Sequence, residues 1–483
     1  MTTTLTAATA ALPHAELRGA DVPLVDATHD SRTVEPGWLF CCVPGENADG
    51  HEYAGEAAER GAAALLVERW LDVDLPQAKV SSVRAAMGPA ASAVHGYPSE
   101  TLDVVGVTGT NGKTTTTYLL ESAFGAAAVG TGVIGTVETR IHGQAQPGLR
   151  TTPESTDLQR LLATMLARGA DAVAMEVSSH GLDLRRVDGT RYAVAVFTNL
   201  SQDHLDWHGT MEAYFDAKAR LFTPHLSERG VICVDDDYGR QLVDRATVPC
   251  ITYGRADDAD HQVVALESGL QGNRARISGP YGDIELSTRL LGAHNALNAL
   301  GAYLAAREIG LEAEAVRAGI GACSGVPGRL EPVDAGQDFT VLVDYAHTPD
   351  ALATTIASLR ELMSEDAALH VVVGAGGDRD PDKRPRIGEV AASADRVVLT
   401  SDNPRSEDPE AILDAVERGA RGAAEPGKIL RQVDRREAIE TALDAAVAGD
   451  VVLIAGKGHE TGQEFADRTV PFDDRLVARE VLS

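Results

Sequence analysis

Short apolar runs rich in β-branched residues alternate with amphipathic stretches in the middle and last parts of the chain. The runs cover residues 102–107, 172–175, 193–197, 340–343, 370–373, 397–400 and 451–455. Among the amphipathic stretches, residues 158–166 have helical spacing, and we expect Thr152 to be the N-cap of this helix, before Pro153. Strands that alternate with helices are typical of parallel sheets covered by helices. The pattern therefore predicts an α/β fold.

Two stretches rich in glycine and proline interrupt this alternation and indicate connections between domains. Residues 88–101 contain Gly-Pro and Gly-Tyr-Pro, and residues 319–332 contain Gly-Val-Pro-Gly. A chain of 483 residues is too long for one ordinary core, and about 150 residues per domain suggests three domains. We therefore predict domains at residues 1–100, 101–328 and 329–483.

Composition and charge narrow the class of protein. Hydrophobic residues make up 44% and charged residues 24% of the chain, as in soluble globular proteins. The formal net charge of −29 argues against nucleic acid or an anionic membrane as the main partner. The five cysteines form no Cys-x-x-Cys pair, which disfavours disulfides and a zinc cluster. Because the sequence shows neither a secretion leader nor a long apolar segment, we expect a cytoplasmic protein without membrane insertion.

The strongest chemical motif joins the apolar run at 102–107 to a helical stretch at 118–124. It consists of Gly109, Thr110, Asn111, Gly112, Lys113, Thr114 and Thr115. Glycines let backbone N–H groups close around an oxyanion, and a helix N-terminus adds partial positive charge. Lys113 can neutralise phosphate, and a following threonine hydroxyl can bind Mg²⁺. The segment therefore predicts a phosphate-binding loop for ATP or GTP and does not identify the reaction.

Polar clusters begin where several apolar runs end. They start at Glu176, Asn199, Asp344, Gly376, Asp402 and Gly456. In open α/β sheets, ligands bind at the carboxyl ends of the strands. We therefore expect these clusters to face one cleft between two domains.

Two of these clusters contain candidate metal ligands. Glu176 could reach a nucleotide-bound Mg²⁺, although a solvated strand end is the alternative. His204 and His208 are spaced as a weak metal pair, and zinc is disfavoured because no third soft ligand is near in sequence. Mg²⁺ with mixed ligands stays open for His204, whereas a structural role is favoured for His208.

Lysine is rare, with six lysines among the 43 basic residues. A helix predicted over residues 211–222 places Lys218 beside Tyr214 and Phe215, so we expect it to be partly buried. Burial lowers the pKa of a lysine, and a neutral amine can react with CO₂ to form a carbamate that binds metal. The alternative is a lysine whose stem follows apolar surface to solvent.

Arg379 and Arg405 each lie in a turn beside an aspartate, Asp378 and Asp402 respectively. Arginine pairs with carboxylates in a bidentate way, so two arginines and an aspartate suit a zwitterionic amino-acid ligand. Local Asp–Arg pairs that stabilise the turns are the alternative.

The order of these motifs closely resembles that of the Mur ligases of peptidoglycan synthesis, from Asp30-Ser31-Arg32 to beyond Glu460. The shared motifs include Gly-Thr-Asn-Gly-Lys-Thr-Thr, Glu-Val-Ser-Ser-His, Asp-Tyr-Ala-His-Thr-Pro-Asp, Asp-Asn-Pro-Arg and Gly-Lys-Gly-His-Glu. The resemblance implies an N-terminal UDP-substrate-binding α/β domain, a central P-loop ATPase-type domain with a parallel sheet, and a C-terminal Rossmann-like domain. It also implies ATP-dependent amide formation on UDP-N-acetylmuramoyl-L-alanyl-D-glutamate through an acyl phosphate.

The resemblance further implies roles for individual residues. ATP would contact residues 109–115 and, further along the chain, His294, Asn295, Arg329, Asp344 and His347. The UDP-muramoyl dipeptide would contact Ser31, Asn47, Thr151, Thr152, Ser178 and Arg186. Thr114 and Glu176 would hold one Mg²⁺, and His204 and a carbamylated Lys218 would hold a second. Lys113, Lys218 and His204 are the implied catalytic residues, and a monomer is expected.

The same resemblance implies the added amino acid. In this family Asp-Asn-Pro-Arg accompanies meso-diaminopimelate, and the implied contacts are Arg379, Asp402, Asn403, Pro404, Arg405, Gly456 and Glu460. A lysine-adding ligase is the nearest alternative, and a folate-polyglutamating ligase and a non-catalytic nucleotide-binding protein are others. A GTPase is disfavoured because no Asn-Lys dipeptide occurs.

Overall fold

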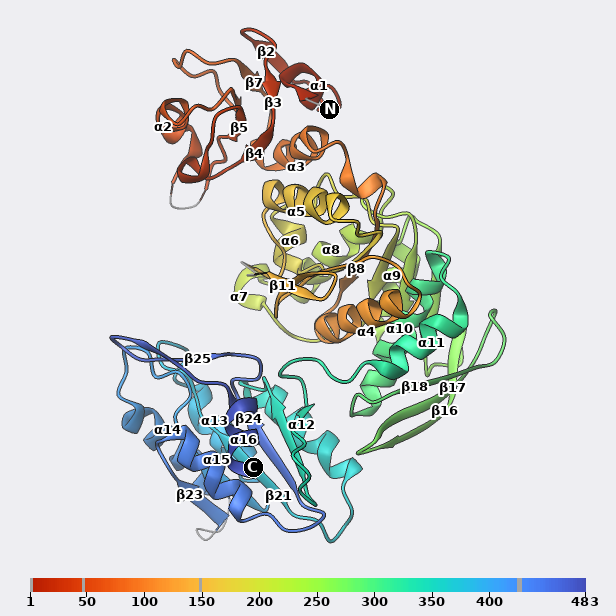
Figure 1. Cartoon of the computed structure of the whole chain (residues 1–483), viewed down its shortest axis with the longest axis vertical. Helices are drawn as coiled ribbons and strands as arrows, with labels where there is room; N and C mark the ends of the chain where they lie inside the picture. Colours follow the sequence, from red (N-terminus) through yellow and green to blue (C-terminus); the bar gives the residue numbers. More distant parts are fainter. Residues whose placement is uncertain (1–2, 46–47, 147–149, 424–427) are drawn as a thin grey trace. The chain divides into compact units, whose positions relative to one another are not determined.

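The computed structural model describes residues 3–45, 48–146, 150–423 and 428–483 (Figure 1). These residues form two compact units. Unit 1 runs to Ala265 and includes Ala275–Leu286 and Leu297–Ala322. Unit 2 comprises Leu266–Arg274, Ser287–Ala296 and Cys323–Ser483.

The N-terminal part of unit 1 contains a five-stranded sheet in the order β2-β7-β6-β5-β4. Strands β4 to β7 are parallel, and β2 is antiparallel to β7. Alternate residues of β5 and β6 enter two apolar clusters, one shared with α1 and α3 and the other with α2. The elements are β1 (Thr3–Thr4), α1 (Leu5–Thr9), β2 (Glu16–Arg18), β3 (Pro23–Leu24), β4 (Asp26–Thr28), β5 (Trp38–Cys41), α2 (Ala54–Glu59), β6 (Ala64–Val67), β7 (Gln77–Lys79) and α3 (Val83–Val94).

The middle of the chain forms an eleven-stranded sheet in the order β11-β10-β9-β12-β8-β13-β14-β15-β16-β17-β18. Its seven strands from β9 to β16 in this order are parallel. The strands are β8 (Asp103–Thr108), β9 (Thr131–Ile134), β10 (Thr139–Ile141), β11 (Gln144–Gln146), β12 (Ala172–Glu176), β13 (Val194–Phe197), β14 (Gly230–Cys233), β15 (Cys250–Gly254), β16 (His261–Gly269), β17 (Gly272–Ser278) and β18 (Ile284–Thr288). The helices are α4 (Lys113–Ala126), α5 (Ser155–Ala167), α6 (Ser179–Asp183), α7 (Leu205–His208), α8 (Met211–Ala219), α9 (Asp237–Arg245), α10 (Ala293–Glu308) and α11 (Ala313–Ala322).

The C-terminal part of unit 2 is a three-layer α/β sandwich around a six-stranded sheet, β19-β20-β24-β21-β22-β23. All strands except β19 are parallel. Helices α12 to α14 cover one face and α15 and α16 the other, so most positions of the strands between them are apolar. The elements are β19 (Glu331–Pro332), β20 (Thr340–Asp344), α12 (Pro349–Leu362), β21 (Leu369–Val373), α13 (Lys383–Ala391), β22 (Arg396–Leu399), α14 (Pro409–Ala423), β23 (Ile429–Arg431), α15 (Arg435–Asp444), β24 (Val451–Ala455), β25 (Gly462–Glu464), β26 (Thr469–Pro471) and α16 (Asp474–Leu482).

The α/β fold with parallel sheets is confirmed, and each of the seven apolar runs overlaps a strand. The predicted cap at Thr152 is wrong: α5 begins at Ser155, and the Thr152 hydroxyl donates to the carbonyl of Glu176 at 3.1 Å. Residues 88–94 are also not a linker, because α3 continues through them. Gly88 serves close packing there, since a Cβ would lie 2.0 Å from the carbonyl oxygen of Asp188. The domain boundaries at 100 and 328 stay predictions.

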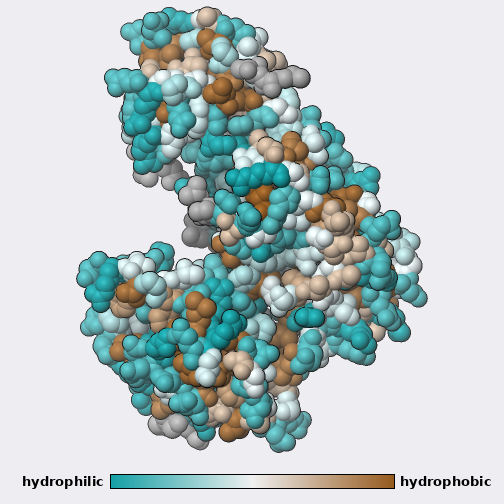
Figure 2. All heavy atoms as spheres, viewed as in Figure 1, coloured by the Kyte–Doolittle hydropathy of each residue, from teal (hydrophilic) through white to brown (hydrophobic). Residues whose placement is uncertain are grey.

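No helix in the described part of the chain has the length and apolar composition needed to cross a membrane. Hydrophilic side chains cover most of the face seen in Figure 2, where apolar ones are scattered among them.

Candidate active site

The phosphate loop lies between the central strand β8 and helix α4 and is shaped by two glycines with positive φ. Gly109 has φ 147° and Gly112 has φ 87°, and α4 begins directly at Lys113. A Cβ at Gly109 would lie 2.0 Å from the Thr198 hydroxyl, so only glycine fits there. The loop is also tied to the end of β13, since Thr198 donates to the carbonyl of Asn111 at 2.6 Å. Strand, loop and helix thus have the geometry that binds an oxyanion.

The side chain of Lys113 folds back onto the phosphate loop. Its Nζ donates to the carbonyls of Gly109 at 2.9 Å and Thr110 at 2.8 Å. Thr114 and Thr115 follow in the first turn of α4, and both are buried. The loop therefore combines a lysine, a helix N-terminus and a threonine hydroxyl at one place.

Glu176 ends β12, the strand next to β8, where it pairs with Val107. Its side chain is buried and accepts hydrogen bonds from Thr136, at 2.8 Å from the backbone N and 3.0 Å from the hydroxyl. These two bonds engage one lone pair on each carboxylate oxygen. The remaining lone pairs suit a hard cation such as Mg²⁺, which prefers oxygen ligands.

Lys218, on α8, is buried more completely than predicted, with 1% of its surface exposed. Its Nζ donates to the carbonyl of Gly109 at 2.8 Å and lies 4.6 Å from the ring centre of Tyr214. Burial and the neighbouring charge of Lys113 hold the pKa of Lys218 well below its ordinary value. An amine in this setting is a nucleophile for CO₂, which is the chemistry that a carbamate needs.

Three histidines form an aromatic cluster beside Tyr214. His204 has φ 52°, is 45% exposed in its side chain, and lies with its ring centre 4.8 Å from that of His180. The ring of His208 lies 5.1 Å from that of Tyr214, a packing contact of the kind expected for a structural role. The described residues contain no cluster of three or more His, Cys, Asp or Glu side chains able to hold a metal ion.

The structure brings together most residues predicted to bind the UDP-muramoyl dipeptide. Thr152 and Ser178 pair through their hydroxyls at 3.0 Å, and Thr151 pairs with Thr136 at 3.0 Å. Arg186 donates to Glu154 at 2.8 Å. Two further predicted residues do not join this group: Ser31 donates to Glu56 in the N-terminal part, and Asn47 lies outside the described residues.

In unit 2, three of the residues predicted on the nucleotide side surround Tyr345. Asp344 is buried and accepts from the backbone N of Leu330 at 2.7 Å, and burial raises its pKa. The guanidinium of Arg329 lies 5.1 Å from the ring centre of Tyr345, and the ring of His347 lies 4.6 Å from it. The other two, His294 and Asn295, begin α10, where the Asn295 amide donates to the carbonyl of Leu291 at 2.7 Å.

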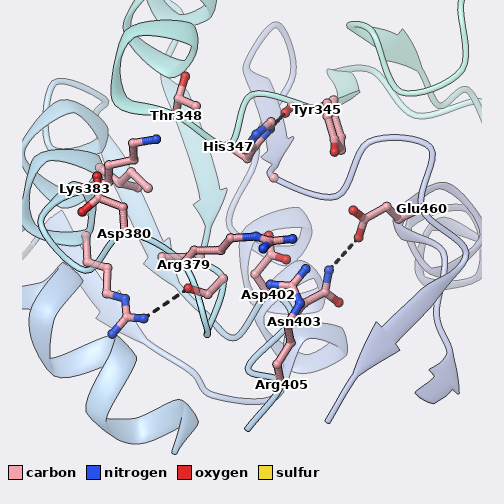
Figure 3. A pocket seen from close by; sticks show the side chains of 16 residues that line it. Tyr345, His347, Thr348, Arg379, Asp380, Lys383, Asp402, Asn403, Arg405 and Glu460 are labelled. Atoms are coloured by element: carbon pink, nitrogen blue, oxygen red, sulfur yellow. Dashed lines mark hydrogen bonds between the residues drawn. The ribbon is translucent and has the colours of Figure 1, made fainter. Parts of the chain in front are cut away.

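A cavity of about 280 Å³ opens at the carboxyl ends of β20, β21, β22 and β24 in unit 2 (Figure 3). Every residue predicted to bind the amino acid lines it except Pro404, which is buried beside it. The lining residues from that set are Arg379, Asp402, Asn403, Arg405, Gly456 and Glu460.

The cavity offers charges of both signs. Asp402 and Glu460 supply carboxylates, while Arg379 and Arg405 supply guanidinium groups. Burial raises the pKa of Asp402. Burial also acts to raise the pKa of Glu460, but the Lys457 ammonium 3.0 Å away and the Asn403 amide 2.7 Å away together outweigh it and hold this pKa below its ordinary value. Such a site matches a ligand that carries both ammonium and carboxylate groups.

Three family models match the chain, and together they cover most of it. Residues 27–98 match the Mur ligase family catalytic domain, 107–306 the Mur ligase middle domain, and 328–458 the Mur ligase glutamate ligase domain. The chain belongs to the Mur ligase family.

Relatives of this Mur ligase match it over nearly its whole length. A UDP-N-acetylmuramoyl-L-alanyl-D-glutamate–2,6-diaminopimelate ligase of Streptomyces coelicolor is 48% identical, covering 94% of this chain and 92% of its own. The enzyme with the same name in Geobacillus kaustophilus is 45% identical, covering 95% of each chain. A solved structure with that name is 33% identical with a TM-score of 0.74, covering 100% of this chain and 99% of its own.

A folylpolyglutamate synthase of Mycobacterium tuberculosis has the same fold at 22% identity, with a TM-score of 0.60 over 76% of this chain and 90% of its own.

Several residues that contact predicted site residues were not predicted from the sequence of this Mur ligase, and Thr136 and Glu154 are two examples. Thr136 holds both oxygens of Glu176, and Glu154 holds Arg186. Thr136 comes two residues after the end of β9, so it fits the pattern of polar residues at strand ends that identified the other clusters. Glu154 carried no such signal, because its partner lies 32 residues away in sequence.

Proposed function

We propose that this Mur ligase is of the MurE type and adds meso-diaminopimelate to UDP-N-acetylmuramoyl-L-alanyl-D-glutamate at the expense of ATP. One observation carries the proposal: the residues Asp402, Asn403 and Arg405 line a single cavity with Arg379 and Glu460. Two relatives of that name are 48% and 45% identical to this chain over nearly its whole length, and this similarity supports the same assignment. We further propose a cytoplasmic monomer.

The reaction has two steps. An oxygen of the D-glutamate side-chain carboxylate attacks the γ-phosphorus of ATP, which forms an acyl phosphate and releases ADP. The amine of diaminopimelate then attacks the acyl carbon, the amide bond forms, phosphate leaves, and the amine loses a proton. The first step brings anions together, so it depends on positioning and charge neutralisation by Lys113 and the N-terminus of α4.

Thr114, Glu176, His204 and Lys218 would hold two Mg²⁺ ions, the last as a carbamate. When bound, these ions supply positive charge to the phosphate oxygens. The buried carboxylate of Glu176 and the buried amine of Lys218 fit this role. Glu176 provides oxygen lone pairs, and Lys218 becomes an anionic oxygen ligand only after it reacts with CO₂.

Arg405 would distinguish diaminopimelate from lysine. Both amino acids carry two amines, but only diaminopimelate has a second carboxylate. In the lysine complex the guanidinium would be left without that partner, and a site built around such a pairing discriminates strongly against a ligand that lacks it.

Phosphate release measured with each substrate omitted in turn tests the proposed function. We expect release only when ATP, UDP-muramoyl dipeptide and meso-diaminopimelate are present together. Release without an amino acid would refute the ligase reaction, and comparable rates with L-lysine would refute the choice of diaminopimelate.

Replacing Lys218 with alanine tests the carbamate. We expect phosphate release to fall about 100-fold, because the second cation loses a ligand, and to recover partly when acetate supplies a carboxylate. The protein equilibrated with ¹³C-labelled bicarbonate should show a carbamate carbon signal that the Lys218→Ala variant lacks. Unchanged activity in that variant, together with an unchanged spectrum, would remove the carbamate.

A further inference from the structure

A short ribbon next to the cavity contacts the segment that carries Arg405. Strand β25 pairs antiparallel with β26 to form this ribbon. The side-chain amide of Gln463, in β25, donates to the carbonyl of Asp402 at 2.7 Å. The backbone N of Glu464 donates to the side chain of Asn403 at 3.1 Å. The ribbon is therefore hydrogen-bonded along the Asp-Asn-Pro-Arg segment and holds it in place.

The ribbon contacts Arg405 through both backbone and side chain. The backbone N of Arg405 donates to the carbonyl of Glu464 at 3.0 Å, and Arg405 has φ 50°, which is unfavourable for a residue with a side chain. Its Nε donates to a carboxylate oxygen of Glu464 at 2.7 Å. Glu464 thus holds Arg405 at two points in a backbone conformation that needs support.

These contacts decide which edge of the guanidinium stays available. Glu464 takes the Nε donor, and the carbonyl of Gly377 accepts from one terminal nitrogen at 2.8 Å. A guanidinium carries five N–H donors, so those remaining belong to the two terminal nitrogens. That terminal edge is one that binds a carboxylate through two parallel hydrogen bonds.

We propose that Glu464 is a positioning residue that sets the specificity of this site by holding Arg405 with its terminal edge toward the distal carboxylate of the amino acid. The inference rests on the proposed function, which supplies that carboxylate. Glu464 acts from outside the site, since Arg405 lines the cavity and Glu464 does not.

An opposite role for Glu464 would be that of a competitor occupying the carboxylate position. Two observations argue against it. Its bond is to Nε rather than to the terminal edge, and its side chain is 51% exposed, against 25% for Arg405. The two roles predict opposite effects of removing the carboxylate, so one series of variants separates them.

The test is steady-state kinetics of Glu464→Ala and Glu464→Gln in the full-length enzyme, with diaminopimelate and lysine as alternative substrates. We expect Glu464→Ala to raise the KM for diaminopimelate about tenfold, with kcat and the KM for ATP within twofold, because one charge-assisted orienting bond is lost. Glu464→Gln keeps an acceptor oxygen for Nε and should recover part of the loss. Any residual activity with lysine, which has no second carboxylate to pair with Arg405, should be unchanged.

Asp467→Asn is the matched control, because Asp467 lies in the turn between β25 and β26, is 73% exposed, and pairs with the adjacent Arg468. It removes the same charge from the ribbon and should leave all constants unchanged.

Three results would overturn the inference. A lower KM for diaminopimelate in Glu464→Ala would identify a competitor, an unchanged KM would show no role, and equal losses for ATP and diaminopimelate would show a general structural role. Failure of the proposed function would look different, because the wild-type enzyme would then release no phosphate with diaminopimelate.

Discussion

Replacing Lys113 with methionine is expected to lower the rate of phosphate release about 1,000-fold while the protein stays folded. The methionine keeps the stem of the side chain but removes the only charge that the loop itself presents to a phosphate. Neutralisation of charge at the transferring phosphoryl group accounts for most of the catalysis in such reactions. The Nζ of Lys113 donates to the carbonyls of Gly109 and Thr110 within its own loop, so we expect its loss to cost the fold little. The measurement is kcat with all three substrates saturating.

Lys428→Met is the control for this variant, because Lys428 is an exposed lysine of unit 2 and should tolerate the same change without effect. Lys113→Arg restores the charge but not the compact ammonium, so it should recover only part of the rate. Activity of Lys113→Met within tenfold of the wild type would contradict the role assigned to this loop.

The fold could be predicted well from the sequence because both faces of its sheets are buried. Strands such as β21 and β24 place alternate residues in clusters on opposite sides of the sheet, so nearly all their positions are apolar and stand out as runs. Helix ends were predicted less well. The close approach of Gly88 to Asp188 joins residues 100 positions apart, and in sequence such a glycine looks the same as one in a linker.

The residues of the candidate site could be predicted where they follow the end of a strand. Gly456 follows β24 directly, and Asp402 follows shortly after the end of β22. Parallel strands have their carboxyl ends at the same edge of the sheet, so these two residues lie close together. Glu464 lies instead on a short ribbon after the last strand of the sheet, and nothing in its sequence context points to Arg405, 59 residues earlier. The arrangement of the two units around one cleft stays a prediction.

A buried ion pair contacts the end of β24, next to Gly456, which lines the cavity of unit 2. Arg435 and Asp474, at the starts of α15 and α16, pair at 2.7 Å with no exposed side-chain surface. Arg435 also donates to the carbonyl of Ala455 at 3.0 Å, the last residue of β24. The pair therefore fixes the strand end that precedes Gly456.

Replacing Asp474 with alanine is expected to destabilise unit 2 by about 3–5 kcal/mol, because Arg435 would be left as a buried charge without a carboxylate. Hydrogen exchange of the amides in β20, β21 and β24 measures this loss locally, whereas the three tryptophans, Trp38, Trp70 and Trp207, all lie in unit 1 and report on that unit.

Glu480→Ala is the matched control, since the exposed pair Arg436–Glu480 joins the same two helices and should contribute less than about 1 kcal/mol. The double variant Arg435→Met/Asp474→Leu should regain most of the stability, because no buried charge remains. Equal exchange in Asp474→Ala and Glu480→Ala would contradict this account of the pair.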